Sequence, residues 1–223
     1  MDVQLGVIGR GYWGNTYCKV LDGLRIPYWQ DGRYWHPRTA DGVIVATSSD
    51  SHYEVARTAL GRRMPVLVEK PVCMDSRDVE ELVGLGGIAF AGHTRLYDPT
   101  WREFKAKLPK VRSVEAWAGG VNETNPDAVW NWGTHLSAMC FDLGFEPYEA
   151  VFHISDEKQP VRFVVNNEFE YRDGPPGALA CLVTEFCDAI RAGKPNNEGL
   201  KLGLKTVQYV EWMKRELCGL HVA

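Results

Sequence analysis

The sequence lacks the features of several classes of protein. Its 25 Lys and Arg residues form no basic run and the formal net charge is −4, so a surface that binds nucleic-acid phosphates is not expected. No apolar stretch approaches the roughly 18 to 20 residues that a membrane span requires. The N-terminus enters an apolar stretch at once, without a basic leader or a cleavage site. We therefore expect a cytoplasmic protein that binds neither nucleic acid nor membranes.

The six cysteines show no functional pattern either. They are scattered through apolar segments with no C-x-x-C pair and no clustered histidines, which argues against a zinc site or a thiol redox motif. Free, buried thiols and no metal are expected. What the sequence does have is an ordinary globular composition, 45% hydrophobic and 24% charged over 223 residues, enough for one large or two small cores.

The first part of the chain alternates short apolar runs with segments of helical character. Buried parallel strands are expected at 3–9, 42–47, 64–68 and 88–91, which are too short for helices. Helices are expected at 15–21, 48–63 and 76–85, the second with a capping box formed by Ser51 and Glu54. This alternation predicts an α/β Rossmann-like domain over 1–94 with a parallel sheet.

After residue 95 the pattern changes. Helices are expected at 99–108, 132–143, 178–192 and 200–217, and strands at 114–118, 150–156 and 161–172. We predict a smaller α+β domain over 95–223 with a mostly antiparallel sheet, which binds substrate and supports oligomerisation. One face of that sheet would be uncovered and would expose apolar area, so a homodimer or tetramer is expected.

A glycine-rich turn, G-x-G-x-x-G, follows the first predicted strand. Its first glycine permits a tight turn, its second lets the backbone approach a pyrophosphate, and its third lets the helix pack against the strand. The predicted phosphate-binding residues are Gly9, Arg10, Gly11, Tyr12, Trp13 and Gly14.

Asp31 lies 22 residues after Gly9, where an acidic residue that binds the ribose is expected. Asp31 could equally well be a turn residue with no contact to a ligand. Only ten residues, 32–41, precede the next strand, which leaves room for one crossover and predicts a truncated sheet with a reduced pocket for the adenosine end. The sequence does not decide between NAD and NADP as the bound dinucleotide. Asp31 favours NAD, whereas Arg33 and Arg38 could bind the 2′-phosphate of NADP.

Several further segments resemble, in order and spacing, the signatures of the Gfo/Idh/MocA (glucose-fructose oxidoreductase / inositol dehydrogenase) oxidoreductases. They are ATSSDSH at 46–52, LVEKP at 67–71, GH at 92–93 with YDP at 97–99, NWGTH at 131–135, and the helical ending at 189–207. Glu-Lys-Pro after an apolar strand is the most specific of these segments, and the resemblance is weakest from 145 to 175.

The resemblance implies an NAD(P)-dependent sugar dehydrogenase or reductase. Such an enzyme transfers a hydride between nicotinamide and a sugar or nucleotide-sugar substrate, with NAD or NADP as cofactor. By the resemblance, the cofactor would also contact Thr47, Ser48, His52, Glu69, Lys70 and Pro71, with a cis Lys70–Pro71 bond. The implied substrate-binding residues are His93, Tyr97, Trp132 and His135.

The implied catalytic residues are Lys70, His135 and Asn131. Oxidation of a secondary alcohol needs a base near neutral pH, which suits the histidine, while a lysine ammonium can stabilise alkoxide charge. Many family members have aspartates where this chain has Asn131 and Ala138. Asparagine can orient a hydroxyl but cannot act as a base, so Asp142 would compensate only if it faces inward. His135 could instead be a packed helix residue.

Two other interpretations of the same sequence stay open. One is a catalytically inactive dinucleotide-binding scaffold or sensor, suggested by the missing crossover and by Asn131. The other is a redox-assisted lyase or glycosidase that keeps NAD tightly bound, as some relatives do.

Overall fold

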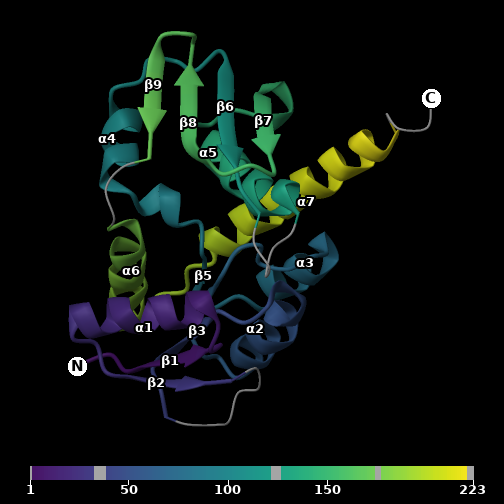
Figure 1. Cartoon of the computed structure of the whole chain (residues 1–223). Helices are drawn as coiled ribbons and strands as arrows, with labels where there is room; N and C mark the ends of the chain where they lie inside the picture. Colours follow the sequence, from purple (N-terminus) through teal and green to yellow (C-terminus); the bar gives the residue numbers. More distant parts are fainter. Residues whose placement is uncertain (1, 33–38, 122–126, 174–176, 220–223) are drawn as a thin grey trace. The chain divides into compact units, whose positions relative to one another are not determined.

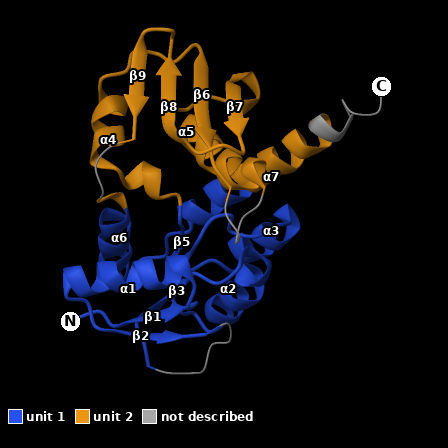
Figure 2. Cartoon of the chain, in the orientation of Figure 1, with its two compact units in different colours: residues 1–92, 179–204 blue, residues 93–178, 205–223 orange. Residues whose placement is uncertain are grey.

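The computed structural model describes residues 2–32, 39–121, 127–173 and 177–219 of the chain, without the side chains of 217–219. It divides into two compact units (Figure 2). Unit 1 comprises Met1–Gly92 and Leu179–Leu204, and unit 2 comprises His93–Ala178 and Lys205–Ala223.

Unit 1 is built on a five-stranded sheet in the order β2-β1-β3-β4-β5, in which every pair of neighbours is parallel. The strands are β1 (Leu5–Ile8), β2 (Tyr28–Asp31), β3 (Gly42–Val45), β4 (Val66–Val68) and β5 (Ala89–Ala91). All residues of β1, β3, β4 and β5 are buried, whereas those of the edge strand β2 are half-buried. The predicted parallel sheet is thus confirmed (Figure 1).

The helices of unit 1 come from both parts of the chain that form it. They are α1 (Tyr12–Leu24), α2 (His52–Gly61), α3 (Ser76–Leu85), α6 (Ala178–Ala192) and the first part of α7 (Glu198–Gly219). Asp75 caps α3 by accepting a hydrogen bond from the backbone N–H of Arg77 (2.9 Å).

The predicted capping box at α2 is wrong. A 3₁₀ turn, η1 (Ser49–Ser51), precedes the helix, and no side chain caps α2. The hydroxyl of Ser51 instead donates to the backbone oxygen of Ser48 and to Oγ1 of Thr47, both at 2.8 Å. Because Ser51 already has a helical backbone, its hydroxyl points back into the turn.

Leu179–Leu204 belong to unit 1, although the sequence predicted that they form part of the second domain. Helix α6 buries an apolar side that includes Phe186, whose ring meets that of Phe90 of β5 edge to face at 5.5 Å. Farther on, Asn196 forms a parallel bridge with Ile88. A β-carbon at Gly199 would lie 2.8 Å from the backbone nitrogen of Ala91. These contacts bring Leu179–Leu204 to the first sheet, although the sequence suggested a continuous second domain from residue 95.

Unit 2 contains a four-stranded sheet in the order β7-β6-β8-β9. The strands are β6 (Val114–Gly119), β7 (Val151–Ser155), β8 (Gln159–Val165) and β9 (Phe169–Arg172). The β6–β8 and β8–β9 pairs are antiparallel and the β6–β7 pair is parallel. The predicted mostly antiparallel sheet is therefore confirmed.

One face of this sheet packs on the helices α4 (Pro99–Ala106) and α5 (Thr134–Asp142). The centre of the core is Trp101, which is fully buried. Its ring meets those of Phe163 and Tyr171 edge to face at 5.4 and 5.1 Å. Burial, together with a hydrogen bond from its hydroxyl to Asp98, raises the pKa of Tyr171 to about 12.

The opposite face of the same sheet carries an outer layer of polar and aromatic side chains. Trp117 of β6 stacks on His153 of β7, with ring centroids 4.9 Å apart, and the guanidinium of Arg162 lies 4.4 Å from the Trp117 ring. Glu115 and Glu170 pair with His153 and Arg162. Stacking and ion pairs thus occupy part of the face where exposed apolar area was expected, because the alternation along these strands turns charged residues outward.

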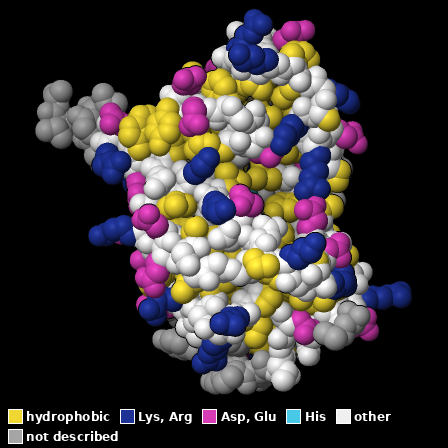
Figure 3. Space-filling view, turned by 180° about the vertical axis from the view of Figure 1, so that it is seen from behind, with side chains coloured by type: hydrophobic (Ala, Val, Ile, Leu, Met, Phe, Trp, Pro, Cys, Tyr) yellow, Lys and Arg dark blue, Asp and Glu magenta, His cyan; other side chains and the backbone are white. Residues whose placement is uncertain are grey.

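Four further observations concern surface charge, membrane-spanning helices, metal-binding clusters and cysteines. On the face shown in Figure 3, Lys and Arg side chains lie among Asp and Glu side chains. Within the described ranges, no helix combines the length and apolarity needed to cross a membrane. The same residues hold no cluster of three or more His, Cys, Asp or Glu arranged to bind a metal. The cysteines that the structure describes are free thiols, four of them buried.

Candidate dinucleotide site and catalytic residues

The glycine turn lies between β1 and α1, and each of its glycines has a distinct role. Gly9 has φ +130°, and a β-carbon there would lie 2.2 Å from the backbone oxygen of Ala46. At Gly14 a β-carbon would lie 2.1 Å from the backbone oxygen of Gly9. At Gly11, however, no atom lies within 4 Å of that position. The turn is closely packed on the protein side and open at the glycine that would face a pyrophosphate.

The N-terminus of α1 is prepared for an anion. No side chain caps the helix and no acidic residue occurs in its first turn, so its first amide groups and the positive end of its dipole are left to a ligand or solvent. Tyr12 is 74% exposed, and its ring meets that of Trp13 edge to face at 5.5 Å. Arg10 is also exposed. These residues fit a dinucleotide at the position predicted from the sequence.

Two residues that the sequence analysis missed hold this turn in place. The side-chain amide of Gln30 donates to the backbone oxygen of Gly9 (2.9 Å) and to Oδ1 of Asn15 (3.0 Å). The amide of Asn15 donates in turn to the backbone oxygen of Arg10 (3.2 Å). A polar residue at a strand end or helix start is too common to mark such a role, so only the three-dimensional contact identifies it.

Asp31 lies at the end of β2, opposite Ile8 of β1. Its backbone oxygen accepts a hydrogen bond from Gly9 (3.0 Å), so β2 ends beside the glycine turn as a ribose-binding acid requires. Its carboxylate accepts from the N–H of Gly32 (2.8 Å), which is the turn contact expected as the alternative. Arg33 and Arg38 lie outside the described residues.

At the end of β4, Glu69 points into the protein. It is 4% exposed, its Oε1 accepts from the hydroxyl of Tyr17 (2.7 Å), and its Oε2 accepts from the backbone N–H of Lys70 (3.0 Å). Burial raises the pKa of Glu69, although the hydrogen bond from Tyr17 and the charge of Lys70 oppose this. The carboxylate therefore links α1 to the end of β4 inside unit 1. Lys70 is 8% exposed, and the Lys70–Pro71 bond is cis.

His52 is also an internal link. It is 1% exposed, with Nδ1 2.8 Å from the backbone oxygen of Pro71 and Nε2 3.1 Å from that of Thr47. Burial lowers the pKa of His52 despite these two carbonyl groups. His52 thus joins the segments that follow β3 and β4, whereas Thr47 is half-buried and Ser48 is exposed at the surface of the turn.

In unit 2, a π-helical turn, η3 (Val129–Gly133), leads into α5. Asp127 begins the turn by accepting hydrogen bonds from the N–H groups of Val129 (2.9 Å) and Trp130 (3.1 Å). The side chains of Asn131 and Trp132 both donate to the backbone oxygen of Gly120, at 3.1 and 2.9 Å. Single π-helical turns often occur at functional sites, and this one carries two of the predicted site residues.

Three of the predicted residues come together beside this turn. The ring of His135 lies 6.5 Å from that of His93 and 5.7 Å from that of Trp132, centroid to centroid, and both histidines are buried. The guanidinium of Arg95 lies 5.4 Å from the Trp132 ring. Tyr97 has a different neighbour, because the guanidinium of Arg102 lies 5.3 Å from its ring.

Asp142 does not compensate for the aspartates that many family members have in place of Asn131 and Ala138, because its carboxylate is bound to another helix. Its Oδ2 accepts from Nε1 of Trp101 (2.9 Å) and its Oδ1 from the ammonium of Lys105 (2.7 Å). Both partners belong to α4, so Asp142 fastens α5 to its neighbouring helix.

The strand order of unit 1 and the glycine turn between β1 and α1 define a dinucleotide-binding domain of the Rossmann type. Residues 18–86 match the family model described as oxidoreductase family, NAD-binding Rossmann fold (GFO_IDH_MocA). The chain is 32% identical over 154 residues to a proposed oxidoreductase, YceM, of Salmonella typhimurium, a match that covers 66% of this chain and 45% of that protein.

Solved structures share the fold. An oxidoreductase structure from Magnetospirillum magnetotacticum gives a TM-score of 0.77 at 20% identity and covers 95% of this chain and 99% of that one. The UDP-N-acetylglucosamine 3-dehydrogenase GnnA of Acidithiobacillus ferrooxidans gives 0.75 at 16% identity and covers 95% and 96%. At these identities the similarity shows the fold alone.

The match of residues 18–86 to the family model agrees with the resemblance to the Gfo/Idh/MocA oxidoreductases that the sequence motifs indicated. The chain spans less than half the length of the curated relatives that it matches, 45% of one and 32% of another.

Proposed function

We propose that this protein is an NAD(P)-dependent oxidoreductase that acts on a hydroxyl or carbonyl group of a sugar or nucleotide sugar. The observation that carries the proposal is the combination, within unit 1, of an open, uncapped glycine turn at α1 with Lys70 at the carboxyl end of β4. In parallel α/β sheets, ligands bind at this end of the strands. The similarity to GnnA, a dehydrogenase of a nucleotide sugar, supports the substrate class.

The cofactor would be held by groups of unit 1. The amides of the glycine turn and the dipole of α1 would bind its pyrophosphate, and Asp31 is positioned at the strand end for the ribose of NAD. Thr47 and Ser48 extend the same edge of the sheet. Glu69 and His52 are buried, so we assign them to positioning Lys70 and the neighbouring turns rather than to contact with the cofactor.

When bound, the nicotinamide accepts or supplies the hydride. In the oxidative direction the hydroxyl of the substrate must also lose its proton, and we propose His135 as the group that accepts it. The ammonium of Lys70 would stabilise negative charge that develops on the substrate. Trp132, beside His135, offers an aromatic face to a sugar ring. Asn131 holds the Gly120 carbonyl, which gives it a positioning role.

The test begins with calorimetric titration of NADH and NADPH into the protein and continues with turnover on a panel of nucleotide sugars. Lys70→Ala should lower kcat by about a hundredfold or more, while the Kd for the cofactor changes little. Lys19→Ala, an exposed lysine on α1, is the matched control and should behave as wild type. Absence of binding by both cofactors, or full activity of Lys70→Ala, would contradict the proposal.

A second candidate is a dinucleotide-binding scaffold or sensor without turnover. It is favoured because Asn131 and Ala138 occupy positions where relatives carry aspartates, and because Asp142, which could have compensated, is bound to α4. Cofactor binding without any absorbance change on the whole sugar panel would support it. A tightly bound cofactor that is reduced and reoxidised within one turnover would favour the lyase or glycosidase alternative.

We also propose that the chain forms a homodimer or tetramer. Support comes from the outer layer of the unit 2 sheet, where the half-buried Trp117 and the exposed His153 form a flat stacked surface of a kind suited to burial against a second copy.

A further inference from the structure

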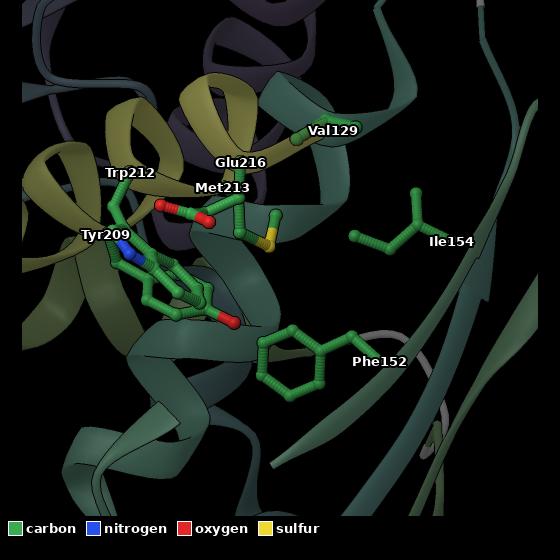
Figure 4. Close-up of a pocket in the computed structure, with 7 residues that line it drawn as sticks. All are labelled: Val129, Phe152, Ile154, Tyr209, Trp212, Met213 and Glu216. Carbon is green, nitrogen blue, oxygen red and sulfur yellow. The ribbon is translucent and has the colours of Figure 1, made fainter. Parts of the chain in front are cut away.

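A pocket in unit 2 is lined by residues that the proposed function does not use. It lies between α7, the edge strand β7 and the turn η3, and has a volume of about 300 Å³ (Figure 4). Such a volume is at the lower end for small-molecule sites, so the pocket suits a ligand of roughly ten heavy atoms.

The walls of the pocket are aromatic. Tyr209 and Trp212 of α7 lie with ring centroids 5.5 Å apart, and the ring of Phe152 on β7 stands edge to face with Tyr209 at 5.8 Å. Figure 4 shows Phe152 across the pocket from α7, with the thioether of Met213 on the α7 side. The faces of such rings attract cations, and tryptophan does so most strongly.

The pocket also has one negative charge. Glu216 follows Trp212 by one helical turn of α7 and is the one charged side chain among the described residues that line the pocket. The neighbouring ammonium groups are engaged elsewhere in unit 2, because Lys214 pairs with Asp127 and Lys205 lies 5.4 Å from the ring of Phe141. Within the described part of the chain, a cation that enters the pocket would therefore meet an aromatic wall and a carboxylate, and no Lys or Arg lines the pocket.

From this combination we propose that the pocket binds a small organic cation, namely a protonated or quaternary amine that carries an apolar or aromatic group. The apolar group would lie against Phe152, Ile154 and Met213, and the cationic group would lie between Trp212 and Glu216. A purely apolar ligand would leave the carboxylate unused, and an anion would be repelled by it.

The pocket adjoins the turn that carries the proposed substrate residues. Val129, which lines it, begins η3. A β-carbon at Gly133, the last residue of that turn, would lie only 3.0 Å from the Cε atom of Met213. An occupant in contact with Met213 thus touches the packing that supports η3. The assignment does not depend on the proposed redox activity, because no residue of the glycine turn or of the His135 cluster lines the pocket.

The test uses benzyltrimethylammonium as the probe, with benzyl alcohol and benzoate as neutral and anionic comparisons, in calorimetric titration and by tryptophan fluorescence. The cation should bind one to one, benzyl alcohol about tenfold more weakly, and benzoate not measurably. Glu216→Gln should weaken cation binding about fivefold, and Trp212→Leu about tenfold or more. Glu103→Gln, the same change at an exposed position of α4, should have no effect.

Three results would overturn the proposal. They are no binding of the cation, equal affinity for benzyl alcohol, and equal affinity of wild type and Glu216→Gln. If Trp212→Leu does not fold, as judged by circular dichroism, Glu216→Gln alone decides, since an exposed carboxylate can be replaced without disturbing the core. A dimer that Trp212→Leu dissociates, with no cation binding by wild type, would show instead that a second copy covers the pocket.

Discussion

Removal of the Tyr17 hydroxyl provides a direct test of the link between α1 and the end of β4. Tyr17 is fully buried, and its hydroxyl donates to Oε1 of Glu69 at 2.7 Å. In Tyr17→Phe the ring stays, but a buried carboxyl group loses a donor. The loss of one partner from a buried hydrogen bond costs about 1 to 3 kcal/mol, so we expect the free energy of unfolding to fall by about 2 kcal/mol. For a chain of this length that corresponds to a decrease in Tm of about 4 to 8 °C.

The pH dependence of that loss makes the prediction sharper. Burial already raises the pKa of Glu69 above its ordinary 4.5, and the Tyr17 hydroxyl opposes the shift, so the variant should raise this pKa further. A carboxyl group whose pKa is higher in the folded than in the unfolded state stabilises the fold below the unfolded pKa. That stabilisation is lost as the pH rises through the folded pKa. The difference between wild type and Tyr17→Phe should therefore widen as the pH rises above the ordinary pKa of a glutamate.

The assay is denaturation followed by circular dichroism at several pH values, with Tyr53→Phe as the matched control. The hydroxyl of Tyr53 also donates to a glutamate, Glu81, at 2.6 Å, but at the protein surface. Its removal should have a much smaller effect, since water replaces the lost partner. Equal losses for the two variants, or a deficit that narrows as the pH rises, would refute the account of Glu69 as a buried link.

Two further predictions concern the glycine turn and the assembly. Gly14→Ala should lower both thermal stability and affinity for NADH, because its β-carbon would lie 2.1 Å from the backbone oxygen of Gly9. Gly11→Ala should reduce the affinity alone, because no atom lies within 4 Å of its β-carbon position. Calorimetry measures the affinity of each variant and thermal scans measure its stability. Light scattering at micromolar concentration should give the mass of a dimer or tetramer that Trp117→Glu reduces, and a monomeric wild type would refute the oligomer proposal.

Much of the fold could be predicted because local patterns and global topology agree. The short apolar runs are too short for typical helices and therefore indicated buried strands, and the G-x-G-x-x-G turn indicated how β1 meets α1. The return of α6 to unit 1 had no local signal, since an amphipathic helix shows that one side is buried but not which sheet buries it.

The candidate site was predictable in outline and not in detail. The motif around Lys70 identified the strand end, but the inward turn of Glu69 and the two carbonyl contacts of His52 depend on where neighbouring segments lie. Sequence spacing likewise allowed Asp142 to face His135, whereas the tertiary contact with α4 decided otherwise. The π-helical turn also left no mark in the sequence pattern, because the i→i+5 hydrogen bonds that define it are made by the backbone.

The interleaved course of the backbone bears on how this protein can be dissected. The polypeptide passes from one unit to the other at Gly92–His93, at Ala178–Leu179 and at Leu204–Lys205, so no single cut releases an intact nucleotide-binding half. A fragment that stops at residue 92 would lack α6 and would expose the ring of Phe90 that Phe186 covers. Laboratory expression of that half on its own would require residues 179–204 to be grafted back onto it through an artificial connection.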